Sequence, residues 1–274
     1  MGFWLNCGGN TNTGVVVIMK KLFTIFTFFL FSCKSSDKTL DKKGDEFKFP
    51  VLIHQTKYDS LEHWKADGIN EIFPKFIGQY KFTDTVNFDN ERQDRNIDEK
   101  QYRWEQNAYD FDTLSSDGLQ IYIDYDKTII TKLYYRATKG STFFPVYVVN
   151  ETTEPKIFFA KDNYVFAIQE AVDSSNFNSW YAIEARGFDF CGNGYFRSKL
   201  MPKEFIVFLM PKYSGTDITY FRTRIRNGES VIISKPYKGV FDKRQFAVTK
   251  DNSWAKDLKK LDYKWMFYGA RNKK

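Results

Sequence analysis

The chain has 274 residues and a formal net charge of +7, from 41 lysines and arginines against 34 aspartates and glutamates. These charges are interspersed along the whole chain, whereas nucleic-acid binding needs a clustered basic stripe or a recognised module, so the sequence argues against a nucleic-acid partner. With only 2 histidines, zinc chemistry and a Ser-His-Asp triad are both poorly supplied.

Residues 19–33 have the layout of an export signal. They read Met-Lys-Lys-Leu-Phe-Thr-Ile-Phe-Thr-Phe-Phe-Leu-Phe-Ser-Cys, which is a basic start, an apolar run of about ten residues and a small residue before a cysteine. The run is shorter than the roughly 20 residues that a membrane-spanning helix needs. We therefore expect a signal peptide over 19–32, translation from Met19, and residues 1–18 outside any core.

The end of this segment, Leu30-Phe31-Ser32-Cys33, resembles the lipobox of bacterial lipoproteins, although Phe31 is bulkier than usual. The resemblance implies that the thiol of Cys33 carries lipid, including palmitate, which would anchor the protein to the membrane. Lys34 is not the aspartate that retains lipoproteins at the inner membrane of enteric bacteria, so we expect the outer membrane, in either leaflet. The alternatives are an ordinary signal peptide that ends in Ser-Cys and a membrane-buried N-terminal helix.

The chain changes composition after the lipid-bearing cysteine. Residues 34–46 are polar, charged and without an aromatic residue, as is typical of a solvated tether. From residue 47 onward, short apolar or alternating runs are broken by Gly, Asn, Asp and Pro at roughly ten-residue spacing, which predicts an antiparallel sandwich or barrel. The predicted strands are 47–53, 79–88, 101–106, 119–125, 128–136, 143–150, 156–159, 165–172, 180–185, 195–200, 205–210, 219–226, 230–234 and 245–249.

Local signals add detail to this pattern. Asn227-Gly228 predicts a hairpin, because this pair accepts positive φ at low cost, and Asp126-Lys127 predicts a second one. Pro145 indicates an edge strand, since proline cannot donate to a sheet ladder. Trp180 on a short strand is of the kind that fills a sandwich core.

Helical periodicity is present in two segments. In Tyr58 to Gly68, Asp59 and Glu62 are spaced as a capping box and Gly68 can end a helix. In 252–268, Trp254, Leu258, Leu261 and Trp265 follow at spacings of four, three and four, and Gly269 stands at the expected stop. We expect this second helix to pack on its own sheet, with docking to a partner as the alternative.

A series of landmarks between residues 144 and 246 resembles an uncharacterised lipoprotein family of Bacteroidota such as flavobacteria. The landmarks are Pro145 to Asn150, Ile168 to Ala171, Trp180 with Ile183-Glu184, Cys191 to Gly194, Leu200 to Pro202, Pro211 to Gly215, Thr223-Arg224, Tyr237 to Gly239 and Gln245-Phe246. The resemblance implies an immunoglobulin-like β-sandwich and brings no known activity with it. The expected fold is therefore mainly β, with a β-rich region at 47–140, the sandwich at 141–250 and a C-terminal amphipathic helix at 251–269.

The candidate sites fall into three chemical groups. Asp124, Asp126 and Asp189 are oxygen ligands for a calcium ion, although they lack the spacing of a known calcium loop. Cys191 lies in a Gly-rich loop and is the one cysteine that remains after Cys7 and Cys33, which excludes an intramolecular disulfide in the mature chain. Aromatic side chains are candidates for stacking on a sugar, namely Tyr122, Tyr134, Tyr135, Tyr195, Phe196 and Tyr213.

Catalytic signatures are weak along the chain. Gly-x-Ser-x-Gly, His-Glu-x-x-His and P-loop patterns are absent, and no cofactor is expected. Glu170 and Glu184 are carboxylates without a local signature for glycoside hydrolysis. The sequence therefore favours a lipid-anchored envelope protein with a non-enzymatic binding or structural role. A glycan-binding or glycan-hydrolysing protein is the first alternative, and a subunit of an envelope complex docked through the C-terminal helix is the second.

Overall fold

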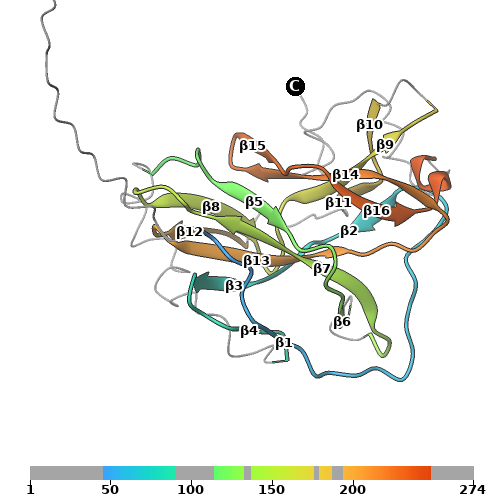
Figure 1. Ribbon diagram of the computed structural model, residues 1–274, viewed down its shortest axis with the longest axis horizontal. Helices are drawn as coiled ribbons and strands as arrows, with labels where there is room; N and C mark the ends of the chain where they lie inside the picture. Colours follow the sequence, from blue (N-terminus) through green and yellow to red (C-terminus); the bar gives the residue numbers. More distant parts are fainter. Residues whose placement is uncertain (1–45, 90–113, 133–136, 176–178, 187–193, 248–274) are drawn as a thin grey trace, which may run out of the picture. The chain divides into compact units, whose positions relative to one another are not determined.

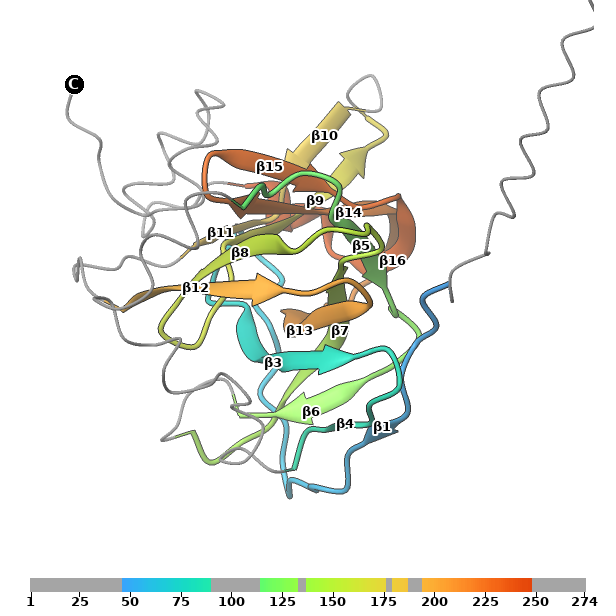
Figure 2. The same cartoon turned by 90° about the vertical axis from the view of Figure 1, so that its left-hand side faces the viewer.

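A computed structural model describes residues 46–89, 114–132, 137–175, 179–186 and 194–247. This part of the chain is mainly β, with several antiparallel sheets, as the sequence predicts. Figure 1 shows the strands crossing one another in layers, and Figure 2 shows the same strands from the side. The first described residue, Glu46, is the last residue of the predicted tether, and the ring of Phe47 is already buried.

One of the two five-stranded sheets is built around two long apolar strands that pair with each other. Its order is β3 (Lys75–Lys81), β13 (Glu204–Pro211), β7 (Ser141–Val149) and β5 (Gln120–Ile123), with β6 (Ile129–Thr131) also paired to β7. The expected regions 47–140 and 141–250 therefore both contribute strands to this sheet. β8 (Lys156–Lys161) and β12 (Tyr195–Leu200) form an antiparallel pair beside it.

The second sheet also has five strands. Its order is β10 (Ser179–Ala182), β9 (Ala167–Asp173), β14 (Asp217–Asn227) and β15 (Ser230–Ile233), with β16 (Tyr237–Phe241) also paired to β14. Two short parallel pairs complete the described strands: β1 (Leu52–Ile53) with β4 (Val86–Asn87), and β2 (Asn70–Ile72) with β11 (Glu184–Arg186).

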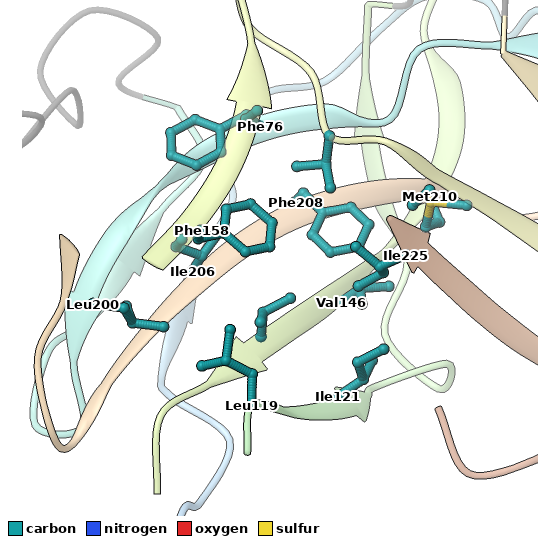
Figure 3. Packing of buried hydrophobic residues seen from close by; sticks show 14 of the residues in the cluster. Phe76, Leu119, Ile121, Val146, Phe158, Leu200, Ile206, Phe208, Met210 and Ile225 are labelled. Atoms are coloured by element: carbon teal, nitrogen blue, oxygen red, sulfur yellow. The ribbon is translucent and has the colours of Figure 1, made fainter. Parts of the chain in front are cut away.

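Both faces of β7 and β13 are buried, which explains why these strands are apolar almost throughout. Val146 of β7 and Phe208 of β13 lie in a cluster with Ile225 of the second sheet, so the two sheets share this core (Figure 3). Tyr147 and Phe205 point to the opposite face, where the segment that begins at Phe47 covers them. In a strand that is buried on both faces, polar and apolar residues do not alternate. Its sequence is therefore a continuous apolar run.

The helix predicted for residues 58–68 is wrong, because this segment follows an irregular path in the structure. The amide of Glu62 donates to the carbonyl of Gly140 at 2.8 Å, and the indole of Trp64 donates to the carbonyl of Thr142 at 2.8 Å. Trp64 packs edge-on against Phe143. Short helices gain little from propensity alone, and here contacts with the β6 to β7 region replace the helical hydrogen bonds.

The expectation that Pro145 marks an edge strand is also wrong, since β7 is paired on both sides. The carbonyl of Pro145 accepts from the amide of Asp124 at 3.3 Å, so its nitrogen also faces the side occupied by β5 and β6. On this side of β7, the pairing with β5 ends at Ile123↔Val146 and the pairing with β6 begins at Ile129↔Phe143. Pro145 lies in the gap between these two paired stretches. The missing N–H therefore removes no ladder hydrogen bond there.

Two further predictions are corrected by the structure. The turn at Asp126-Lys127 exists, but β5 and β6 both pair with β7 and form no hairpin with each other. The strand predicted at 245–249 is replaced by a single 3-10 turn, η1 (Lys243–Phe246), because Asp242 and Gln245 close a capping box around it. The predicted strand at 101–106 and the helix at 251–269 lie outside the described residues.

The hairpin predicted at Asn227-Gly228 is confirmed. Asn227 pairs with Ser230 across a two-residue loop, and Gly228 has φ of 62°. A Cβ on Gly228 would also lie 2.9 Å from a ring carbon of Phe159. Both the positive φ and this close approach require glycine.

Replacing this glycine tests the hairpin. Gly228→Ala is expected to lower the free energy of unfolding by about 1 to 2 kcal/mol, because a side chain is strained at positive φ. Urea unfolding followed by circular dichroism measures the change. The matched control is Glu229→Ala, in the same loop, which we expect to leave the midpoint nearly unchanged. Equal losses in the two variants would contradict the strain argument.

Candidate functional site

Strand β9 places two polar residues in succession on opposite faces of the second sheet. Gln169 points to the side of the core, where it contacts Glu184, and Glu170 points to the other side, where it meets two arginines. Alternation along the strand produces this division. Both side chains are fully buried, so each needs partners of its own.

The inner group is a connected network around the carboxyl of Glu184, the first residue of β11. The backbone amide of Gln169 donates to Oε2 of Glu184 at 2.5 Å, and its Nε2 donates to Oε1 at 2.6 Å. The hydroxyl of Tyr213 donates to Oε1 at 2.7 Å. The hydroxyl of Tyr237 donates to Oε1 of Gln169 at 3.0 Å and lies 3.2 Å from Oγ1 of Thr223. Strands β9, β14 and β16 and the start of β11 are thereby joined inside the fold.

Burial dominates the protonation behaviour of this network. Complete burial raises the pKa of Glu184 to about 7, against the opposing effect of the hydrogen bonds from Tyr213 and Gln169. Burial, followed by the nearby Glu184 carboxyl, raises the pKa of Tyr213 well above its ordinary value. The tyrosines therefore stay protonated donors, and Glu184 is the group in the network that can change its charge near neutral pH.

The outer group combines Glu170 with two arginines of β14. Arg222 Nε lies 2.5 Å from Oε2 of Glu170, and Arg224 Nε lies 3.0 Å from Oε1. The guanidinium of Arg222 also lies 4.5 Å from the ring centroid of Trp180. Trp180 is thus a half-buried residue stacked on an arginine at the sheet surface, not the core plug expected from the sequence, because β10 is the edge strand of its sheet.

Comparison with known protein families, curated proteins and solved structures finds no match to the chain. The part of the chain that the structure describes has no helix long and apolar enough to span a membrane.

The two buried glutamates do not form a hydrolytic pair. Such a pair faces one cleft across roughly 5 to 9.5 Å, whereas Glu170 and Glu184 lie on opposite sides of strand β9. Glu184 is enclosed by donors and has no exposed surface. Its geometry is suited to holding four strands together, because each hydrogen bond crosses from one strand or loop to another.

This arrangement explains several of the sequence landmarks that had no assigned role. Gln169, Glu184, Tyr213, Thr223 and Tyr237 come from five separate landmarks and meet in the inner network. Their positions along the chain do not indicate that they meet. The available signal was polar residues inside otherwise apolar strands, which must find partners when buried.

The aromatic candidates are dispersed over different elements. The hydroxyl of Tyr122, on β5, donates to Glu151 at 2.8 Å, and burial raises the pKa of this tyrosine to about 12. Tyr195, on β12, is exposed and stacks on Phe166. Tyr213 and Phe196 are buried, so neither offers a ring to a sugar at the surface. Tyr134 and Tyr135 lie outside the described residues.

The carboxylates considered for calcium lie in the turn after β5. The ammonium of Lys212 donates to the carbonyl of Tyr125 at 2.6 Å and to Oγ1 of Thr128 at 2.9 Å, and it is near Asp124 and Asp126. Burial lowers the pKa of Lys212 and raises that of Asp124. Lys212 thus supplies positive charge to this turn from within the chain.

Other predicted site residues lie beyond the region that can be described. They are Cys33, Asp189 and Cys191. Among the described residues, no group of three or more His, Cys, Asp and Glu side chains is placed to hold a metal ion.

Proposed function

We propose that the protein is a lipid-anchored lipoprotein of the cell envelope, in the outer membrane, with a non-enzymatic binding or structural role. The single observation that carries this proposal is the segment from Met19 to Cys33, with its basic start, short apolar run and Leu-Phe-Ser-Cys end. A polar stretch of 12 residues separates Cys33 from Glu46, which suits a folded body held away from its lipid.

The finer form of the fold belongs to the same proposal. We place an immunoglobulin-like sandwich at residues 141–250 and an amphipathic helix at 251–269. Two sheets that share one apolar core support the sandwich. The spacing of Trp254, Leu258, Leu261 and Trp265 supports the helix.

A non-enzymatic role is favoured by how the buried polar groups are used. The carboxyls of Glu170 and Glu184 bind arginines, amides and hydroxyls of the chain itself. Networks of this kind hold a fold in one arrangement when every member has a partner. The body is therefore a rigid support, and its surface carries the binding function.

The lipid anchor is tested by metabolic labelling with an alkyne analogue of palmitate. The wild-type chain is expected to incorporate the label, and Cys33→Ser is expected to lose it entirely, because the thiol is the acceptor. Cys7→Ser and Cys191→Ser are matched controls that should keep full labelling. Labelling of the Cys33→Ser variant, or an unlabelled wild type that nonetheless remains with the membranes, would contradict the proposal.

A further inference from the structure

Three apolar side chains form an exposed stripe on the segment where the described fold begins. Phe49, Val51 and Ile53 alternate along this segment and are 48%, 69% and 37% exposed. Between Val51 and Ile53, Leu52 packs inward against two buried clusters that contain residues of β7 and β13. We call Phe49, Val51 and Ile53 the β1 stripe. The three exposed side chains lie within five consecutive residues of the chain.

The β1 stripe is held in place by the fold. The amides of Val86, which begins β4, and of Phe88, which follows it, donate to the carbonyls of Val51 and Ile53, each at 2.9 Å. The ring of Phe49 lies against buried Tyr147, with 5.3 Å between centroids. Figure 1 and Figure 2 show β1 beside β4 at the edge of the described strands. A fixed apolar surface costs less ordering on binding than a mobile one.

We infer that the β1 stripe docks on the surface of the phospholipid bilayer that holds the lipid of Cys33, so that the protein lies against the membrane through this segment. The inference rests on the proposed lipid anchor. It extends that proposal from a point of attachment to a contact surface with a defined orientation.

The position of the stripe in the chain favours a bilayer over a second protein as its partner. Phe49 is three residues beyond Glu46, where the predicted tether ends. For a polar linker of this length, the root-mean-square span is about 20 Å and the maximum is about 45 Å. The stripe is therefore held within reach of the bilayer at all times, which makes docking an intramolecular step with a high effective concentration.

Exposed apolar residues elsewhere in the described part of the chain are not held close to the lipid of Cys33 by a short segment. Ile218 is 75% exposed on β14, far along the chain from the lipid-bearing cysteine. Ile218 and Val51 are both exposed aliphatic side chains, and they differ in their distance along the chain from Cys33. Ile218 is accordingly the matched control for a membrane contact.

The test uses the full lipidated chain, with Cys191→Ser as background, in vesicles of phosphatidylethanolamine and phosphatidylglycerol. A nitroxide is attached at Val51→Cys or at Ile218→Cys, and its accessibility to oxygen and to a water-soluble nickel complex is measured. At Val51→Cys, docking is expected to raise oxygen access and to lower nickel access about tenfold relative to detergent solution. At Ile218→Cys, both values should stay near those in detergent.

Each other outcome has a distinct meaning. If the protein floats with the vesicles and nickel access is as high at Val51→Cys as at Ile218→Cys, the docking is overturned. The proposed lipid anchor is not contradicted by this result. Protection from both reagents overturns it in favour of a second protein, or another copy, on the stripe. Protein that does not float with the vesicles contradicts the anchor and the docking together. A further variant, Val51→Ser, should raise nickel access at a nitroxide on Ile53→Cys.

Discussion

Glu184→Gln is expected to remove most of the pH dependence of stability between pH 4.5 and 7. In the wild-type protein, burial raises the pKa of Glu184 from 4.5 to about 7. The folded state therefore binds more protons than the unfolded state in this range, and the free energy of unfolding falls as pH rises. A shift of this size corresponds to a loss of about 3 kcal/mol across the window.

The sign of this effect follows from which form the fold prefers. The stabilisation is fully present below pH 4.5, where the carboxyl is protonated in both states, and it is lost as pH rises through about 7. Glutamine has nearly the same shape as glutamate and does not titrate. Its contribution to the free energy of unfolding therefore does not change with pH. Urea unfolding at half-unit pH steps, with the wild-type and Glu184→Gln curves subtracted from each other, isolates the contribution of this residue.

Tyr213→Phe provides an independent check on the same carboxyl. The hydroxyl of Tyr213 lowers the pKa of Glu184 by donating a hydrogen bond to it, so its removal should move the pH window upward. The variant should also be less stable than wild type at pH 8, where the carboxylate has lost a donor. Parallel pH profiles for wild type and Glu184→Gln would show that Glu184 does not titrate in this range.

The double variant Arg222→Ala/Arg224→Ala is expected to lower the free energy of unfolding by about 3 to 5 kcal/mol. The two arginines contact both oxygens of Glu170, whose side chain is 0% exposed. Removing both leaves a buried carboxylate without a cation, which is the costly way to break an ion pair. Denaturant unfolding at pH 7 measures the loss directly.

Replacing Glu170 together with the two arginines separates the cost of the unpaired charge from the cost of lost packing. Adding Glu170→Met to the double variant should recover most of the stability, because an apolar side chain needs no cation in that position. Glu170→Met alone should cost less than the double variant, since the side chains of Arg222 and Arg224 keep 21% and 14% of their surface in water. If the triple variant is no more stable than the double variant, the unpaired charge is not the cause.

Several features of the fold follow from local sequence because their causes are local. The hairpin at Asn227-Gly228 is specified by a glycine that tolerates positive φ. The strands β7 and β13 are indicated by apolar runs bounded by turn residues. Their complete burial on both faces is the reason for those runs.

The predictions that the structure overturns depend on partners distant in the chain. Residues 58–68 carry a capping pattern, but Trp64 is 78 residues from the carbonyl that its indole binds, and nothing in the local pattern reveals this contact. Pro145 signals an edge strand by its missing N–H, and only the gap between β5 and β6 makes a central position acceptable. Trp180 has the size of a core residue, but the order of the strands places it beside Arg222.

The sequence by itself determined the mainly β class, the hairpin at Asn227-Gly228 and the Met19 to Cys33 segment that motivates the lipid anchor, because each depends on residues that are close together in the chain. Only the tertiary structure decided that Gln169, Glu184, Tyr213 and Tyr237 share one buried network and that Glu170 lies on the opposite face. Strand order and register bring these residues together, and both are set by packing between segments far apart in the sequence.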